Sequence, residues 1–153
     1  MKHLLLSTSI ALTAAGGAFS WTAETNNGIH FATNKIDEYN EISVICDAGF
    51  NAPITSINFV VDGIVPAPES LVFLQFDQDK PIFVSTDVEG AIASETAGQA
   101  RDFNQVVSGL RDAAQVRIRL YDGSSQIFSL RGSTEAIGSD CRADYDRFQL
   151  ALN

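Results

Sequence analysis

The chain has 153 residues, of which 45% are hydrophobic and 19% are charged. This length suits one ordinary domain, and the apolar content excludes wholesale disorder, collagen-like repeats and coiled coil. The 10 Lys and Arg residues against 19 Asp and Glu residues give a formal net charge of −9. Because an acidic surface repels phosphate backbones and anionic headgroups, we expect no nucleic-acid partner.

Residues 1–20 have the pattern of a secretory signal peptide. Lys2 gives a basic start, residues 4–15 are mostly apolar, and Ala18-Phe19-Ser20 places small residues where a signal peptidase cuts. A membrane anchor is the alternative, but this apolar stretch is shorter than the ~20 residues that span a bilayer. We therefore expect cleavage before Trp21.

The expected product, residues 21–153, is a single β-rich domain with no membrane span. Its formal charge becomes −10, because the signal segment holds one lysine and no acidic residue. We place it in a bacterial periplasm, where the oxidising environment favours disulfides over free thiols.

Cys46 and Cys141 are the two cysteines of the chain. In an oxidising compartment they predict one structural disulfide, with two reduced thiols as the alternative. A ring of 95 residues would contribute on the order of 4 to 5 kcal/mol through loop-closure entropy. We expect no metal at the pair, because the expected product holds one histidine, His30, and has no Cys-x-x-Cys spacing.

Alternation of apolar and polar residues predicts most of the fold as strands. Residues 71–76 are apolar on both faces, which is typical of a central strand. Residues 34–40 are polar and predict a turn, and residues 91–94 could add a short edge strand. The seven predicted strands cover residues 28–33, 41–47, 54–61, 71–76, 82–86, 116–121 and 126–131.

Two short helices interrupt this pattern. Phe103, Val106, Val107 and Leu110 lie at helical spacing and predict a helix over residues 102–111. Ser133 or Thr134 could cap a second helix that runs to about Cys141. These elements predict a mainly β protein, an antiparallel β-sandwich-like domain with two short helices.

The sequence predicts no catalytic residue, metal or cofactor. His30 has no nucleophile motif near it, and a lone histidine on a strand is usually a surface or rim residue. Asp77, Asp79, Asp87 and Glu89 surround a predicted hairpin and could bind Ca²⁺, but they lack a calcium-loop spacing and fit a solvated acidic turn better. A pair of carboxylates for glycoside hydrolysis is neither supported nor excluded.

Three arginines are candidate partner-binding residues. Arg117 and Arg119 point outward from one predicted strand, and we expect Arg131 opposite them on the paired strand. Guanidinium groups on an acidic protein could receive a carboxylate from a partner. The simpler interpretation, which the many carboxylates favour, is edge protection and local ion pairing.

The order of Cys46, a central apolar strand, a helix and a closing segment from Phe128 to Cys141 resembles the type VI secretion-associated VasI/TagI-like proteins. The closing segment reads Phe128-Ser129-Leu130-Arg131-Gly132-Ser133 before its cysteine. The same segment also resembles the invasion-associated locus B family, whose members carry more cysteines. Either resemblance implies a β-rich envelope protein without established catalysis.

These observations predict a non-enzymatic periplasmic accessory or binding protein. Its expected partner is an unidentified envelope or secretion-system protein, for which it could act as an adaptor. An exported inhibitor or small-ligand carrier is the alternative, with Ile64 to Pro68 as the best candidate loop. A hydrolase with paired carboxylates is the third possibility.

Overall fold

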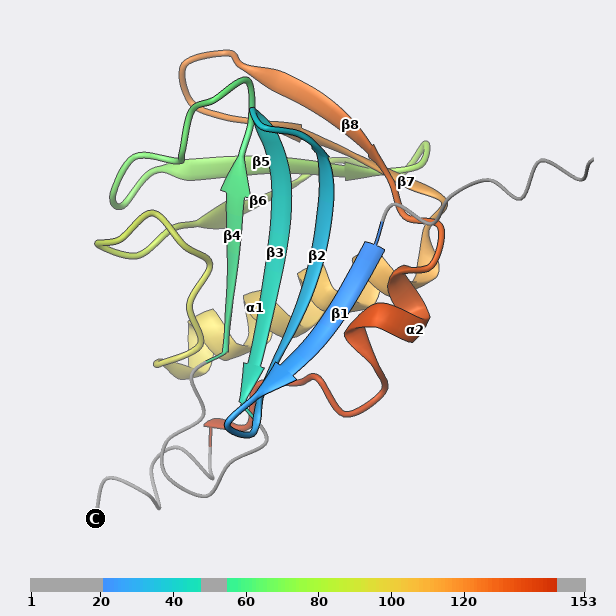
Figure 1. Cartoon of the computed structure of the whole chain (residues 1–153). Helices are drawn as coiled ribbons and strands as arrows, with labels where there is room; N and C mark the ends of the chain where they lie inside the picture. The colour runs from blue at the N-terminus through green and yellow to red at the C-terminus, as the bar shows by residue number, and fades with distance from the viewer. Residues whose placement is uncertain (1–20, 48–54, 146–153) are drawn as a thin grey trace, which may run out of the picture.

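A computed structural model describes residues 21–47 and 55–145 (Figure 1). The predicted signal peptide at residues 1–20 lies outside these residues and stays a prediction. Residues 48–54, which include the first residue of the predicted strand 54–61, and residues 146–153 also lie outside them.

Two antiparallel sheets of four strands each form the domain, which confirms the predicted mainly β, sandwich-like fold, with eight strands where the sequence predicted seven. In the first sheet the spatial order follows the chain, β1-β2-β3-β4. In the second sheet the order is β6-β5-β7-β8, so β5 lies between β6 and β7. The strands are β1 (Trp21–Asn26), β2 (Ile29–Asp37), β3 (Asn40–Asp47), β4 (Ser56–Val60), β5 (Leu71–Phe76), β6 (Ile82–Ser85), β7 (Gln115–Arg119) and β8 (Ser125–Ser129). The helices are α1 (Ala97–Asp112) and α2 (Ser133–Ile137).

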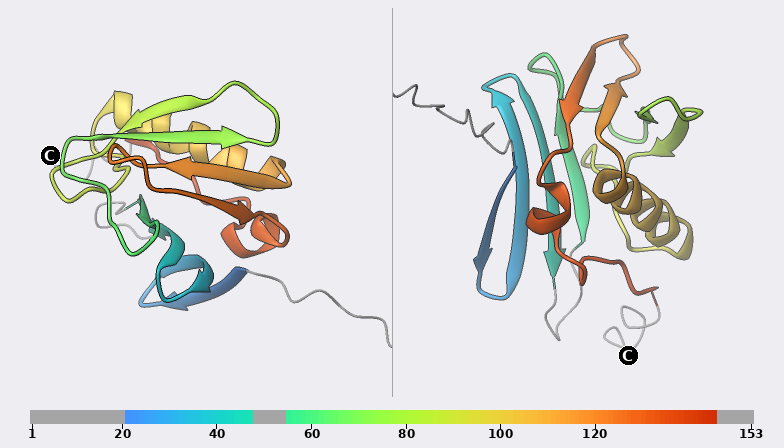
Figure 2. Two further views of the ribbon diagram at one scale, coloured as in Figure 1. Left: turned by 90° about the horizontal axis from the view of Figure 1, so that it is seen from above. Right: turned by 90° about the vertical axis from the view of Figure 1, so that its right-hand side faces the viewer.

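The sheets and α1 enclose one hydrophobic core. Figure 2 shows α1 and the second sheet on the same side of the first sheet, and its left panel shows the second sheet lying over α1. Because strand side chains alternate between faces, each sheet contributes every second residue to this core. The core includes Ile42, Val44, Ile57 and Phe59 from the first sheet, Val72, Leu74, Val116, Ile118 and Phe128 from the second, and Phe103, Val106, Val107 and Leu110 from α1.

A buried amide also joins the two sheets. Asn34 on β2 has no exposed surface, and its Nδ2 donates to the carbonyl oxygen of Ser129 on β8 at 2.7 Å. The contact satisfies a carbonyl at one edge of the second sheet. It therefore ties together strands that are 95 residues apart in the chain.

The first sheet differs from the prediction at its N-terminal end. The structure adds β1, which pairs along its length with β2. β2 runs through residues 34–37, where a turn was predicted, and the turn falls at Glu38-Tyr39. The inward residues of β2 include Ala32 and Asn34, so the buried face carries a small residue and an amide that give little hydrophobic signal.

Helix α1 is longer than the predicted 102–111. It begins after Thr96, whose Oγ1 accepts from the backbone N–H of Gln99, while the Gln99 Oε1 accepts from the backbone N–H of Thr96. This reciprocal capping box satisfies two backbone donors at the helix start. The capping box places the start of α1 before the predicted residue 102, in a segment of small residues where the apolar pattern predicts no helix.

Helix α2 is shorter than predicted and has a different cap. It ends at Ile137, and its N-cap is Gly132, which has φ +88° and makes no side-chain cap. The predicted cap, Ser133 or Thr134, is therefore wrong. Thr134 Oγ1 instead donates to the carbonyl of Arg111 at 2.8 Å, so the hydroxyl ties α2 to the end of α1. Within the described part of the chain, neither helix has the length and apolar composition needed to cross a membrane.

Candidate functional site

The outer face of the second sheet carries a group of exposed apolar and basic side chains. Alternation turns the odd-numbered residues of β5 and β7 away from the core, because their even-numbered neighbours are buried. We call this surface the arginine–aromatic face. It consists of Leu71, Phe73, Gln75, Phe83, Arg117, Arg119, Tyr121 and Ile127.

Strand register places several of these side chains in rows across the sheet. In one row Phe83 lies opposite Phe73, and Phe73 lies opposite Arg119. In the adjacent row Arg117 lies between Gln75 and Ile127. Each arginine of β7 therefore has an apolar side chain as a direct cross-strand neighbour.

Ring contacts hold the first row together. The Phe73 and Phe83 ring centroids are 3.9 Å apart in an edge-to-face arrangement. The guanidinium carbon of Arg119 lies 4.2 Å from the centroid of the Phe73 ring, within cation–π range. Phe83 is 57% exposed even so, and Leu71 and Tyr121 are exposed to a similar degree.

Two hollows mark this face, one on each side of the Phe73–Arg119 contact. One, of about 140 Å³, is lined by Phe73, Gln75, Pro81, Arg117 and Arg119. The other, of about 370 Å³, is mainly apolar and is lined by Leu71, Phe73, Phe83, Arg119, Leu120, Tyr121 and Gly123. Arg119 borders both hollows and Arg117 borders the smaller one, so both guanidinium groups adjoin apolar surface on this face.

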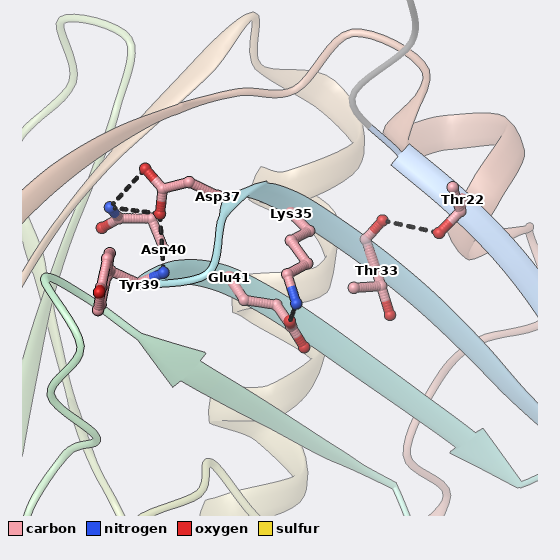
Figure 3. Close-up of polar contacts among 7 residues, drawn as sticks. All are labelled: Thr22, Thr33, Lys35, Asp37, Tyr39, Asn40 and Glu41. Atoms are coloured by element: carbon pink, nitrogen blue, oxygen red, sulfur yellow. Dashed lines mark hydrogen bonds and ion pairs between the residues drawn. The ribbon is translucent and has the colours of Figure 1, made fainter.

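Arg117 and Arg119 have no carboxylate within ion-pair distance among the residues that the structure describes. The first sheet provides a contrast, because there Lys35 lies 3.6 Å from Glu41 across the β2–β3 hairpin (Figure 3). The local pairing that the sequence favoured for the arginines is therefore absent from β7 in the described structure. Edge protection is also excluded for β7, since it is an inner strand.

Arg131 does not belong to this group. The residues opposite Arg117 and Arg119 on β8 are Ile127 and Ser125, whereas Arg131 follows the end of β8. The predicted position of Arg131 opposite the other two is therefore wrong. The cause is strand length: β8 ends at Ser129, and its register brings Ser129 opposite Gln115.

Cys46 and Cys141 lie at disulfide distance, with their Cα atoms 5.5 Å apart. Cys46 is on β3 in the first sheet, and Cys141 follows α2, so the bridge fastens the C-terminal segment to that sheet. Both side chains are buried. The predicted pairing of Cys46 with Cys141 is confirmed by this distance.

His30 lies beside this bridge and is partly buried. Its Nε2 is 2.6 Å from the carbonyl oxygen of Ala136, and its Nδ1 is 3.2 Å from the Oγ1 of Thr25. Because the carbonyl is an acceptor, Nε2 carries the proton, and Nδ1 accepts from the hydroxyl. Both nitrogens are engaged in holding α2 and β1, which is a structural arrangement.

The acidic residues near the β5–β6 hairpin also bind backbone. The Asp77 carboxylate accepts from the backbone N–H groups of Ala114 and Gln115 at 3.0 to 3.2 Å. The Asp87 Oδ1 accepts from the backbone N–H groups of Glu89 and Ala91. No group of three or more potential metal-ligating side chains occurs within residues 21–47 and 55–145.

Arg111 is a partly buried contact residue that the sequence analysis missed. From the last turn of α1 its guanidinium donates to the carbonyls of Gly138 and Cys141, the second at 2.7 Å. Burial lowers the pKa of Arg111, and the nearby carboxylates of Asp112 and Asp140 offset this in part. No sequence pattern marks such a role, because its partners are main-chain carbonyls 27 and 30 residues away.

The aromatic half of the face was also missed, although a signal for it exists. Residues 71–76 are apolar on both faces, which predicted a strand covered on both sides. β5 is central within its sheet, but no further layer of residues 21–47 and 55–145 covers its outer side, so Leu71 is exposed and Phe73 half-buried among them. In an antiparallel sheet with one solvated face, an apolar outer side indicates a contact surface.

A family model described as YfjT matches residues 19–137. No curated protein and no solved structure matches the chain. The match spans both sheets, both helices and the whole arginine–aromatic face. It does not bear on the resemblance to VasI/TagI-like or invasion-associated proteins, which stays a prediction.

Proposed function

The chain belongs to the YfjT family, and we propose that it is a non-enzymatic, exported binding protein that contacts a protein partner through the arginine–aromatic face. In this proposal the partner is an envelope or secretion-system protein. The β-sandwich-like domain serves as a rigid support for the face, and the Cys46–Cys141 bridge fastens its C-terminal segment.

The observation that carries the proposal is the state of Arg117 and Arg119. The chain has 19 acidic residues, yet neither arginine has a carboxylate partner in the described structure. Exposed apolar side chains surround both. Arginine and aromatic residues together are the composition that protein–protein interfaces enrich, with Lys, Glu and Asp depleted at the interface centre.

The apolar side chains add a second argument. Leu71, Phe83 and Tyr121 are more than half exposed and line one hollow. A partner that covers these side chains would gain roughly 25 cal/mol of favourable free energy for every Å² of apolar surface removed from water. Monomeric soluble proteins rarely expose such contiguous patches without a use for them.

Export is supported by the pattern of residues 1–20 and by the cysteine pair. A buried pair at disulfide distance is compatible with an oxidising compartment. In a periplasm a binding protein meets envelope components directly. The resemblance to the VasI/TagI-like proteins points to the same class of partner.

Site-specific photo-crosslinking in intact cells tests the proposal. A photoreactive phenylalanine analogue replaces Phe83 on the face, and the matched control carries it at Tyr39, which is 56% exposed on the β2–β3 turn. We expect one discrete envelope-protein adduct from position 83 and none from position 39. Equal adducts at both positions, or none at position 83, would contradict the proposed contact surface.

An exported inhibitor or small-ligand carrier remains the alternative, because Ile64 and Val65 of the predicted loop are exposed. Val61 and Ile64 exchange two backbone hydrogen bonds, and this turn projects Val65, which is 62% exposed. A thermal-shift panel of periplasmic metabolites and hydrolases separates the two functions. Stabilisation that is lost in Val65→Ser, with no crosslink at position 83, would favour the alternative.

A further inference from the structure

We infer that the arginine–aromatic face recognises an extended acidic segment of its partner. In this segment carboxylates occupy positions i and i+2, and a bulky apolar side chain occupies position i+4. This inference rests on the proposed function and adds the chemistry of the ligand. It depends on the spacing of β7, on the two hollows and on the charge of the whole chain.

Strand spacing sets the separation of the two arginines. Arg117 and Arg119 are two residues apart on β7 and point to the same side, which places their Cα atoms about 7 Å apart. An extended peptide has the same repeat between side chains on one of its faces. Carboxylates at alternate positions therefore match the two guanidinium groups one to one.

The chain leads from the arginines, past the end of β7, to the larger hollow. Tyr121 follows Arg119 by two residues and lines the hollow of about 370 Å³ together with Leu71 and Phe83. The smaller hollow, of about 140 Å³, holds both arginines and Gln75. A segment lying along β7 would put its carboxylates over the smaller hollow and its next side chain on that face into the larger one.

The Phe73 ring prepares Arg119 for a carboxylate. A guanidinium that stacks on an aromatic ring uses its flat face, so its in-plane N–H donors stay available. The ring contact at 4.2 Å also restricts the side chain before the partner arrives. The entropic cost of forming a two-pronged hydrogen bond to a carboxylate is therefore reduced.

Net charge favours a peptide over larger anionic surfaces. Nucleic acids and anionic bilayers present charge over their whole extent, and they would repel the acidic remainder of a chain with a formal charge of −9. A short acidic segment meets only the local positive charge of the face. The exposed rings also need an apolar partner, which a phosphate backbone does not offer.

Titration of the purified, oxidised protein with synthetic peptides tests this inference by two-dimensional NMR. The probe is Gly-Ser-Asp-Ser-Asp-Ser-Leu-Ser-Gly, together with the same peptide in reverse order, so that both chain directions along β7 are tested. We expect saturable shifts at the amides of Phe73, Arg117 and Arg119 for one of the two orders. Replacing both Asp by Asn, or Leu by Ser, should weaken binding about tenfold.

Charge reversal supplies the matched control. Arg117→Glu with Arg119→Glu should abolish peptide binding, whereas Arg142→Glu, an exposed arginine outside the face, should leave it unchanged. Equal binding of the Asp and Asn peptides would overturn the inference. So would stronger binding to vesicles of anionic phospholipid than to the Asp peptides, which would identify a lipid surface as the ligand.

The two proposals fail separately. An envelope-protein adduct at position 83 that persists in the charge-reversed variant would keep the proposed function and reject the acidic ligand. Loss of that adduct in the charge-reversed variant, with wild-type unfolding midpoints, supports both. Absence of any adduct at position 83 rejects the contact surface itself, whatever the peptides do.

Discussion

Reduction of the Cys46–Cys141 bridge should remove a large part of the stability of this protein. The bridge closes a loop of 95 residues. The chain-entropy relation for a ring of this size gives about 4.7 kcal/mol at 25 °C, which is an upper figure. Because domains of this kind are stable by roughly 5 to 15 kcal/mol, a loss of the full amount would be about a third of the total stability or more.

The structure indicates that this loss comes from the unfolded chain. Other contacts hold the segment around Cys141 in the folded state: Arg111 donates to its carbonyl, and Asn104 exchanges two hydrogen bonds with the backbone of Ala143 at 2.8 and 3.0 Å. These contacts do not depend on the sulfur–sulfur bond. The folded structure should therefore persist after reduction, while the unfolded ensemble gains freedom.

Urea unfolding of the oxidised and reduced protein, followed by tryptophan fluorescence and circular dichroism, measures the effect. With a slope of about 2 kcal/mol per molar urea, the midpoint should fall by about 2 M. The control is a double variant, Cys46→Ala with Cys141→Ala, whose midpoint should not respond to reductant. A loss below about 1 kcal/mol in the reduced protein would refute the reasoning.

Three further substitutions test individual contacts by urea unfolding. Thr96→Ala removes the capping box of α1 and should cost about 1 kcal/mol, whereas Thr96→Ser should keep most of it. Gly109→Ala places a Cβ about 2.5 Å from ring carbons of the buried Phe76. The overpacking cost of about 1 to 3 kcal/mol should exceed the helix-propensity gain of about 1 kcal/mol, so the variant should be less stable than the wild type. Arg111→Met keeps an unbranched side chain but removes the hydrogen bonds to the carbonyls of Gly138 and Cys141. The free energy of unfolding should fall by about 1 to 3 kcal/mol, and amide exchange in that segment should become faster.

Each of these expectations has a contrary result. An unchanged midpoint in Thr96→Ala would mean that the first turn of α1 contributes nothing to stability. A stabilised Gly109→Ala variant would mean that the Phe76 ring moves aside freely. Unchanged amide exchange in Arg111→Met would show that the two Arg111 hydrogen bonds do not hold the C-terminal segment.

The sequence by itself determined the fold class and the inward faces of its best-defined strands. Val116, Ile118 and Leu120 alternate strictly with polar or basic residues, and burial of one face leaves such a strand no other register. The stripe of Phe103, Val106, Val107 and Leu110 likewise fixed the side of α1 that enters the core. Two cysteines in an expected oxidising compartment left a single pairing.

Only the tertiary structure decided which features become a surface. Apolar residues on both faces of β5 predicted cover on both sides, and the sequence could not show that one side stays uncovered in the described part of the chain. The position of Arg131 depended on where β8 ends, and the use of Arg111 depended on carbonyls brought close by a distant turn. Periodicity records which side of one element is apolar, whereas exposure and polar contacts depend on how several elements are placed together in space.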